Sequence, residues 1–220
     1  MNSPAPKTFA ENVPRVIVFT RHPDPGKTKT RMIPALGPVG AANLQAALTR
    51  HTLAMAQEYC DQHPCELEVR FTGGDAIKMG DAFGSGRTYR PQSGEDLGAR
   101  MAHAVADAFA EHATVAVLIG SDCPDITPTI LDEAVRALSV HDVVVGPAID
   151  GGYYLIAVRQ NQPLLFEDIQ WGSDCVLRQT LAQAKQAQLR VHCLQTLSDV
   201  DHPQDLVVCR RHPDAFPELP

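Results

Sequence analysis

An aspartate, Asp122, lies just beyond a continuous apolar run of the chain. Val115 to Ile119 is a continuous apolar run, and Gly120-Ser121 separates it from Asp122. Such a run, bounded by turn residues, is typical of a strand buried on both faces of a parallel sheet. Ligands in open α/β sheets bind beyond the carboxyl ends of the strands, so we expect Asp122 at the mouth of a site. Its carboxylate, paired with a second one, could hold Mg²⁺ or Mn²⁺ against a substrate diphosphate. The alternative interpretation is an Asx turn that ends the strand.

A basic loop follows the first apolar run, Val16 to Phe19. It carries Arg21, Lys27, Lys29 and Arg31, with a glycine at Gly26, in a chain that is acidic overall. Lys and Arg donors, together with backbone N–H groups at a glycine, suit a diphosphate or a triphosphate. The loop is not a Walker A motif, which needs a glycine at position 21. The alternative is a solvated basic loop without a ligand.

A glycine-rich turn, Asp150-Gly151-Gly152, precedes Tyr153 and Tyr154. Asp-Gly is the commonest hairpin-turn dipeptide, which explains the pattern without a ligand. Two glycines also let the backbone approach a bound substrate closely. Asp150 could then bind a hydroxyl group or act as the general base for an acceptor. Neighbouring side chains alternate along a strand, so we expect one of the two tyrosines to face the cleft.

Trp171 is the single tryptophan and lies between polar residues in a predicted loop. A core position is the usual place for tryptophan. Its amphipathic ring is equally suited to stacking on a sugar or a nucleobase at the edge of a site.

The elements that must position these residues alternate along the chain. The sequence pattern predicts strands at 16–19, 67–71, 115–119, 142–146, 153–158 and 190–194, and a further short one at 87–90. Helical spacing or capping residues predict helices at 41–59, 97–109, 128–138, 174–186 and 203–210. Strands alternating with helices indicate an α/β fold with a mainly parallel central sheet flanked by helices. A length of 220 residues suits one such domain. We place it at 15–212, between a disordered lead-in at 1–14 and a tail at 213–220.

Composition excludes several classes of function. The formal net charge of -7 argues against a nucleic-acid or anionic-membrane binder. No apolar run approaches the roughly 18 residues of a transmembrane helix, and residues 1–14 lack the apolar core of a signal peptide. The six scattered cysteines indicate thiols in a reducing cytoplasm. Cys60, His63 and Cys65 could ligate a metal, although no second ligand pair has zinc-site spacing.

The order of motifs resembles the DUF2064 family, whose members are often labelled glycosyltransferases by inference. The motifs are Pro25 to Met32, Gly120 to Asp125, Gly146 to Ile156, Trp171-Gly172 and Asp199 to Leu206. Together they span roughly 15–206. The resemblance implies the GT-A fold of the nucleotide-diphospho-sugar transferase superfamily. Lys29-Thr-Arg-Met is also similar to a motif of 2-phospho-lactate guanylyltransferases, and Ser-Asp-Cys-Pro to one of molybdenum-cofactor guanylyltransferases.

The same resemblance implies a partner for Asp122. Superfamily relatives place a second metal-binding residue just before a Pro-x-Asp-Leu segment, which here is Asp201, with Asp199 in reserve. Helix capping is the alternative for Asp201, and we expect Asp205 to be structural. Cys123 and Pro124 replace the rest of the Asp-x-Asp motif of many glycosyltransferases, so only one carboxylate remains there.

Three functions follow as hypotheses. The first is metal-dependent glycosyl transfer from a nucleotide sugar to the hydroxyl of a small-molecule acceptor, which the motif order favours. The second is nucleotidyl transfer from a nucleoside triphosphate to a phosphorylated acceptor, which the four cations of the basic loop favour. The third is a nucleotide-binding domain without catalysis. Mg²⁺ and Mn²⁺ are equally compatible with carboxylate ligands.

Overall fold

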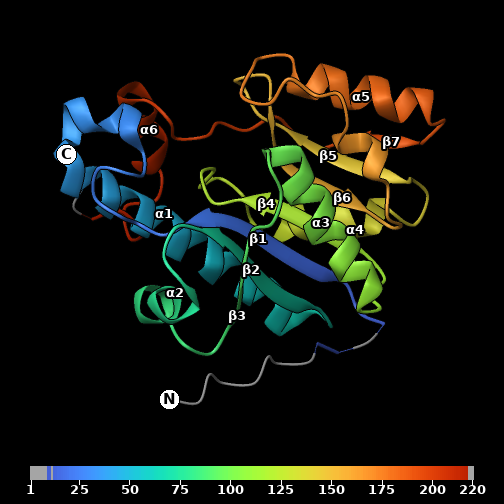
Figure 1. Ribbon diagram of the computed structural model, residues 1–220, viewed down its shortest axis with the longest axis horizontal. Coiled ribbons are helices and arrows are strands. Elements are labelled where there is room, and N and C mark those ends of the chain that lie inside the picture. Colours follow the sequence, from blue (N-terminus) through green and yellow to red (C-terminus); the bar gives the residue numbers. More distant parts are fainter. Residues whose placement is uncertain (1–8, 11, 218–220) are drawn as a thin grey trace.

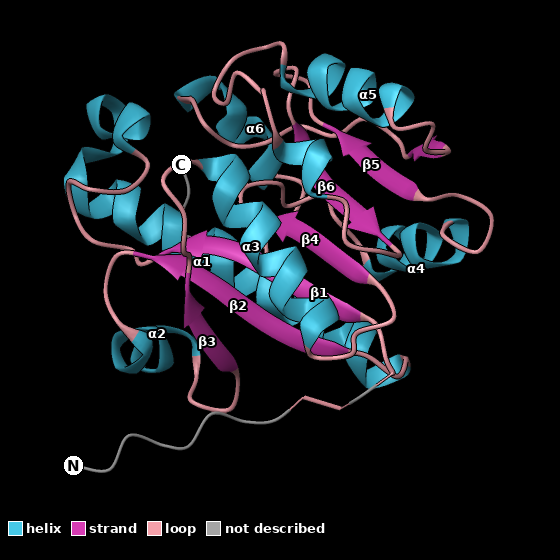
Figure 2. Ribbon diagram, turned by 45° about the vertical axis from the view of Figure 1, so that its right-hand side comes forward, coloured by secondary structure: helices cyan, strands magenta, loops and turns pink. Residues whose placement is uncertain are grey.

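Seven strands form one sheet between two layers of helices in a computed structural model of the chain, which describes residues 9, 10 and 12–217 (Figures 1 and 2). The strand order is β3-β2-β1-β4-β6-β5-β7. Neighbouring strands are parallel except where β6 pairs antiparallel with β4 and β5. The exception arises because β5 and β6 are joined by the short turn at 148–152, which makes them a hairpin. The predicted mainly parallel sheet is confirmed.

The strands are β1 (Arg15–Arg21), β2 (Glu66–Thr72), β3 (Thr88–Pro91), β4 (Ala116–Gly120), β5 (Val143–Pro147), β6 (Tyr153–Val158) and β7 (Val191–Cys193). The helices are α1 (Ile33–Gln62), α2 (Ala76–Phe83), α3 (Leu97–Ala110), α4 (Pro128–Ala137), α5 (Val176–Gln186) and α6 (Leu206–Cys209). Short 3₁₀ helices are η1 (Thr30–Met32), η2 (Pro163–Phe166) and η3 (Pro203–Asp205).

The central strands are buried on both faces, as their continuous apolar sequences predict. On β1, Val16 and Val18 pack in a core with α1, α2 and α4, whereas Ile17 and Phe19 pack on the opposite face with α3 and α5. The alternation follows from the two-residue period of a strand. A third core joins the first half of α1 to α6 and the C-terminal segment.

Two helical segments differ from the prediction. Helix α2 lies in a stretch expected to be irregular, and it forms because the Asp75 carboxylate caps the amide of Lys78 at 2.9 Å. Helix α1 starts at Ile33, within the stretch predicted as a loop through Pro38. Gly37, with φ of 68°, kinks it there, which lets the chain continue past Pro38.

Both ends of the described chain pack on the domain more fully than expected. The guanidinium of Arg15 lies 3.7 Å from the centre of the Phe9 ring, and the Ala10 amide donates to Glu66 Oε1. The disordered lead-in predicted for 1–14 is therefore wrong for its described final residues, while residues 1–8 and 11 lie outside the described part. In the tail predicted at 213–220, Phe216 is buried in the third core, so the domain extends past residue 212.

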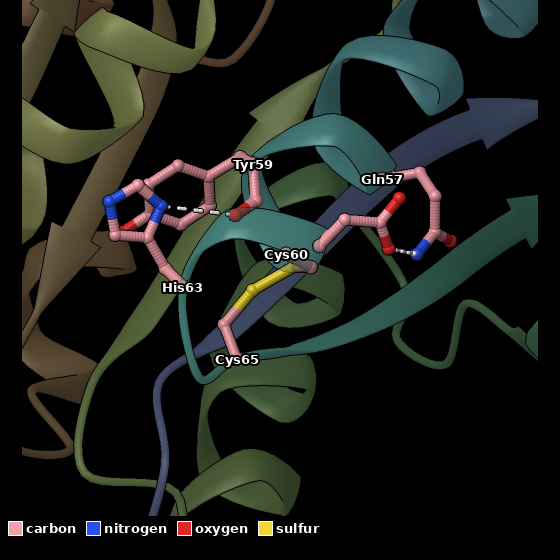
Figure 3. Close-up of a disulfide and its surroundings, with 6 residues drawn as sticks. Gln57, Tyr59, Cys60, His63 and Cys65 are labelled. Atoms are coloured by element: carbon pink, nitrogen blue, oxygen red, sulfur yellow. Dashed lines mark hydrogen bonds between the residues drawn. A yellow bond between two sulfur atoms is a disulfide. The ribbon is translucent and has the colours of Figure 1, made fainter.

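Cys60 and Cys65 form a disulfide, contrary to the expectation that all six cysteines are thiols (Figure 3). Helix α1 ends at Gln62 and β2 starts at Glu66, which brings the two Cα atoms to 5.1 Å. His63 stacks on Tyr59 beside the bridge. Oxidised sulfurs are not thiolate ligands, so the metal hypothesis for Cys60, His63 and Cys65 is wrong. The four free cysteines are Cys123, Cys175, Cys193 and Cys209.

The helices found in residues 9, 10 and 12–217 include none with the length and apolar character to cross a bilayer.

Candidate functional site

A cleft of about 880 Å³ lies beyond the carboxyl ends of β1 and β4. These two strands are adjacent and parallel, so the loops that follow them meet at one edge of the sheet. The predicted residues that line the cleft are Arg21, Lys29, Arg31, Asp122, Asp150, Gly152, Tyr153, Trp171 and Asp201. The sequence motifs are far apart in the chain, and the fold brings them to a single cavity.

Lys29 lies between the two aspartates predicted as metal ligands. Its ammonium is 2.9 Å from Asp122 Oδ1, 2.9 Å from Asp201 Oδ1 and 2.7 Å from the carbonyl oxygen of Val200. Its side chain is 5% exposed. Burial lowers the pKa of Lys29, but the charges of Asp122 and Asp201 outweigh it, so the pKa is raised overall. In this arrangement Lys29 neutralises carboxylates, whereas the sequence predicted that it would bind phosphate.

Arg31 approaches the same pair from the exposed side, with Nη1 at 3.3 Å from Asp201 Oδ2. Burial raises the pKa of Asp201, but the charges of Lys29 and Arg31 and the hydrogen bond from Lys29 outweigh it and lower the pKa overall. Asp201 is therefore held as a carboxylate. Arg31 is 62% exposed and remains accessible to an anionic ligand.

The loops that carry these charges are tied together through the backbone. Lys29 adopts a left-handed conformation with φ of 45°, and its carbonyl accepts from Met32 at the turn of η1. The Val200 amide donates to the Asp122 carbonyl at 2.9 Å. Asp205 accepts from the amides of Asp201 and His202, which confirms its structural role. Backbone hydrogen bonds thus hold both the loop that carries Lys29 and the loop that carries Asp201.

A buried polar network that the sequence did not reveal lies beneath this pairing. Gln45 of α1 accepts from Thr28 Oγ1 at 3.0 Å and donates to Thr49 and Ser121. Ser121 and Thr49 both contact the Thr20 hydroxyl. Thr28 and Ser121 immediately precede Lys29 and Asp122 in the chain, so the network fixes the start of both functional loops. Gln45 falls on the buried face of a predicted helix. A polar residue at such a position was the only sign in the sequence that a buried network exists.

The remaining residues of the predicted phosphate loop lie outside the group formed by Lys29, Asp122 and Asp201. Arg21 is exposed, and it donates from Nε to Thr72 Oγ1 and from Nη1 to the Lys27 carbonyl. Gly26 and Lys27 are exposed and do not line the cleft. Gly26 has φ of 79°, so it serves a turn in the loop. Of the four cations in the predicted phosphate loop, Arg21, Lys29 and Arg31 line the cleft and Lys27 does not.

The turn between β5 and β6 places Asp150 at the cleft. Asp150 Oδ1 accepts from the Gly152 amide at 2.8 Å, an Asx-type hydrogen bond within the turn that joins the two strands. Gly151 does not line the cleft. A methyl group there would clash with the backbone of Asp174, so this glycine serves packing and not the substrate approach expected of it. The other carboxylate oxygen of Asp150, Oδ2, does not take part in this hydrogen bond.

Asp199 has a more prominent place in the cleft than the sequence predicted. It lines the cleft, and burial raises its pKa to about 6, with further contributions from the charges of Asp150, Asp201 and Asp122. A group that titrates near neutral pH can exchange protons during a reaction. The sequence predicted Asp199 only as a reserve metal ligand, since burial could not be read from it.

Two aromatic side chains close one side of the cleft. Trp171 and Tyr153 meet edge to face at 6.4 Å, and both line the cavity. The absence of a side chain at Gly98 makes room for the indole nitrogen against α3. Trp171 therefore combines a packed edge with a cleft-facing position. Tyr154 is buried and donates to the Gln195 carbonyl. Arg100 and Gln92 also line the cleft and were not predicted.

The Asp122–Asp201 pair fits a hard divalent cation. Asp122 Oδ1 is buried, and the Lys29 ammonium near it is an ion pair without hydrogen-bond alignment. Two carboxylates and the Val200 carbonyl already converge on one cationic group, and oxygen donors of this kind suit Mg²⁺ or Mn²⁺. No group of three His, Cys, Asp or Glu side chains forms a metal shell within the described residues. Substrate oxygens and water would have to complete the coordination.

The strand order and the position of the cleft define the α/β fold class of nucleotide-diphospho-sugar transferases, as expected. Residues 53–173 match the family described as "Uncharacterized protein conserved in bacteria (DUF2064)". The chain belongs to the DUF2064 family.

The chain is also similar to several solved structures. A protein of Desulfovibrio desulfuricans G20, assigned by inference to the nucleotide-diphospho-sugar transferases, is 33% identical over 94% of this chain and 91% of its own, with a TM-score of 0.83. A nucleotidyl transferase of Methanothermobacter thermautotrophicus is 17% identical over 91% and 97%, with a TM-score of 0.62. The Rv0371c protein of Mycobacterium tuberculosis H37Rv, solved with manganese, is 18% identical over 91% and 97%, with a TM-score of 0.55. The last two show the fold alone. Among curated proteins there is no significant match.

Proposed function

We propose that the protein is a metal-dependent transferase of a nucleotide-activated donor, and that it transfers a sugar from a nucleotide sugar to an acceptor hydroxyl. The observation that carries the proposal is the meeting of Lys29 and Arg31 with Asp122, Asp150 and Asp201 in one cleft. The cleft is large enough for a donor and a small acceptor. The 33% identical relative, itself assigned to nucleotide-diphospho-sugar transferases, favours the same class.

The residues divide into a donor end and an acceptor end. Arg21, Lys29 and Arg31 supply cations for the donor phosphates. Asp122 and Asp201 would hold Mg²⁺ or Mn²⁺, which neutralises charge on the leaving diphosphate. Tyr153 and Trp171 offer aromatic faces for a sugar or a base.

Asp150 lies at the acceptor end in this proposal. The acceptor oxygen forms a bond to the anomeric carbon while the bond from that carbon to the diphosphate oxygen breaks. The acceptor proton passes to the Asp150 carboxylate, and the nucleoside diphosphate leaves. Oδ1 is held by Gly152, so Oδ2 is the atom for the proton. Asp199 shares this part of the cleft, and the charge of Asp150 helps to raise the pKa of Asp199.

A nucleotidyltransferase is the second candidate. The cations Arg21, Lys29, Arg31 and Arg100 all line the cleft, which suits the larger charge of a triphosphate. In that reaction a phosphorylated acceptor attacks the α-phosphate and pyrophosphate leaves. A nucleotide-binding domain without catalysis is the third hypothesis, and the carboxylate of Asp150 in the cleft argues against it.

The leaving group distinguishes these functions. We expect the protein with Mn²⁺ to release nucleoside diphosphate from a nucleotide sugar, and Asp150→Asn to lower this rate by about 10²–10⁴-fold while donor affinity is unchanged. Asp174→Asn, an exposed carboxylate at the same cleft, is the matched control and should keep its rate. Pyrophosphate from nucleoside triphosphates, without nucleoside diphosphate, would establish the second candidate. Neither product, with nucleotide binding intact, would establish the third.

A further inference from the structure

The ammonium of Lys29 lies among three oxygen atoms. It donates hydrogen bonds to the Val200 carbonyl at 2.7 Å and to Asp201 Oδ1 at 2.9 Å, and it forms an ion pair with Asp122 Oδ1 at 2.9 Å. The side chain is 5% exposed, so solvent does not compete for these contacts. In this position the ammonium is paired with these carboxylates and this carbonyl, and not with a phosphate.

The same three oxygens are the donor set of the candidate metal site. A divalent cation needs the Asp122 and Asp201 carboxylates, and it cannot share them with an ammonium at hydrogen-bonding distance. Two cations on one pair of partly buried carboxylates would also repel each other. Lys29 and the metal therefore exclude one another at this position.

We propose that Lys29 is an internal cation that occupies the metal position, and that it gives way when donor phosphate and divalent metal enter together. This proposal rests on the proposed function and specifies how its site is loaded. The incoming phosphate provides a new partner for the ammonium, and the vacated carboxylates then bind the metal. Metal and nucleotide affinities are consequently coupled, and each ligand raises the affinity for the other.

The backbone around Lys29 allows its side chain to move alone. Thr28 is buried and held by Gln45, and the Lys29 carbonyl is held by Met32 in the turn of η1. The exchange then requires new side-chain rotamers and no refolding of the loop. Lys27 is on the same loop, is exposed and does not line the cleft, so it is a suitable control cation.

Calorimetry with Mn²⁺ alone tests the exchange without any turnover. We expect Lys29→Gln to bind Mn²⁺ at least about tenfold more tightly than the wild type, since the internal competitor is removed. Lys27→Gln should change this affinity by less than about threefold. Equal Mn²⁺ affinity of the wild type and Lys29→Gln would overturn the proposal.

A measurement on the wild-type protein covers the case in which Lys29→Gln fails to fold. Nitrogen NMR of labelled lysines should show one ammonium signal protected from exchange with water. Mg²⁺ with inorganic pyrophosphate should shift or remove that signal, whereas Mg²⁺ alone at the same concentration should not. A protected signal that Mg²⁺ and pyrophosphate leave unchanged would overturn the exchange.

The failure of this inference is distinguishable from failure of the proposed function. Product release by the wild type, together with equal Mn²⁺ affinities, overturns the exchange and leaves the transferase. Tighter Mn²⁺ binding by Lys29→Gln, without product release from any donor, supports the exchange and overturns the transferase. An absence of both Mn²⁺ binding and product release overturns both.

Discussion

Asp199 carries a charge that the folded protein disfavours. Burial and the charges of Asp150, Asp201 and Asp122 raise its pKa from 3.8 to about 6. A raised folded-state pKa means that the folded state binds the proton more tightly than the unfolded chain. Its contribution to stability is therefore fully present below about pH 4 and is lost as the pH rises through about 6.

Asp199→Asn should consequently stabilise the metal-free protein above pH 6. The rise in the pKa of Asp199 from 3.8 to about 6 corresponds to roughly 3 kcal/mol, and the partial exposure of the side chain reduces our expectation to about 1–2 kcal/mol. Urea unfolding at pH 7.5 should show this gain, and unfolding at pH 4 should show almost none. Asp174→Asn, which replaces an exposed carboxylate, should show no gain at either pH. A gain of equal size at both pH values would contradict the electrostatic explanation.

The sequence was most informative for residues at strand ends. Asp122 could be placed because an apolar run and a turn precede it, and this signal depends on local order alone. The partner of Lys29 could not be predicted in this way, because Asp201 is 172 residues away and the charges of both loops suited phosphate or metal equally. Burial of Asp199 likewise depends on how loops from several elements pack.

The polar network beneath the site joins three elements, the end of β1, the end of β4 and helix α1. Gln45 is 4% exposed, and its amide oxygen and nitrogen connect Thr28, Thr49 and Ser121. Replacing the amide with an apolar group of similar length leaves the buried Thr28 hydroxyl without its partner, while Thr49 and Ser121 keep their hydrogen bonds to Thr20. The penalty for such an unpaired group is about 1–3 kcal/mol.

Gln45→Met should therefore lower the free energy of unfolding by about 1–3 kcal/mol and weaken binding of a metal–nucleotide complex, because both functional loops start from this network. Gln57→Met is the control on the same helix. Gln57 makes a single surface hydrogen bond to Asp61, and its loss should cost less than about 0.5 kcal/mol. Chemical unfolding and calorimetry would measure both effects. A loss of stability with unchanged ligand affinity would show that the network supports the fold but not the site.

Most elements followed from periodicity, and those that did not have identifiable causes. The seven predicted strands are all present. Continuous apolar runs mark the buried central strands, and alternation of apolar and polar residues marks 67–71. Helix α2 was missed because glycines at 73, 74, 80 and 84 surround and interrupt a short apolar pattern. The Cys60–Cys65 disulfide was missed because it depends on a sharp reversal between α1 and β2.

At the scale of the whole molecule, the C-terminal segment joins the site loops to the rest of the domain. Phe216 is 5% exposed and shares a core with Met32, Leu44 and Val200. Val200 lies between Asp199 and Asp201, and Met32 ends the turn that carries Lys29. Sequence composition predicted a tail here, since eight terminal residues with three prolines carry no periodic pattern.

Phe216→Ala tests whether this core unfolds together with the sheet. Loss of a buried phenylalanine should cost about 3 kcal/mol. Trp171, the single tryptophan, packs in the core on the opposite face of the sheet and reports on a distant part of the molecule. If the chain is one cooperative unit, urea transitions followed by tryptophan fluorescence and by far-ultraviolet circular dichroism should move to lower concentration by the same amount. Val207→Ala, at an exposed position of α6, should leave both transitions within about 0.5 kcal/mol of the wild type. The opposite outcome is a circular dichroism transition that moves while the fluorescence transition stays in place. It would mean that the C-terminal segment and the first turns of α1 unfold separately from the sheet. Lys29 and Asp201 would then be held by a less stable part of the molecule than Trp171.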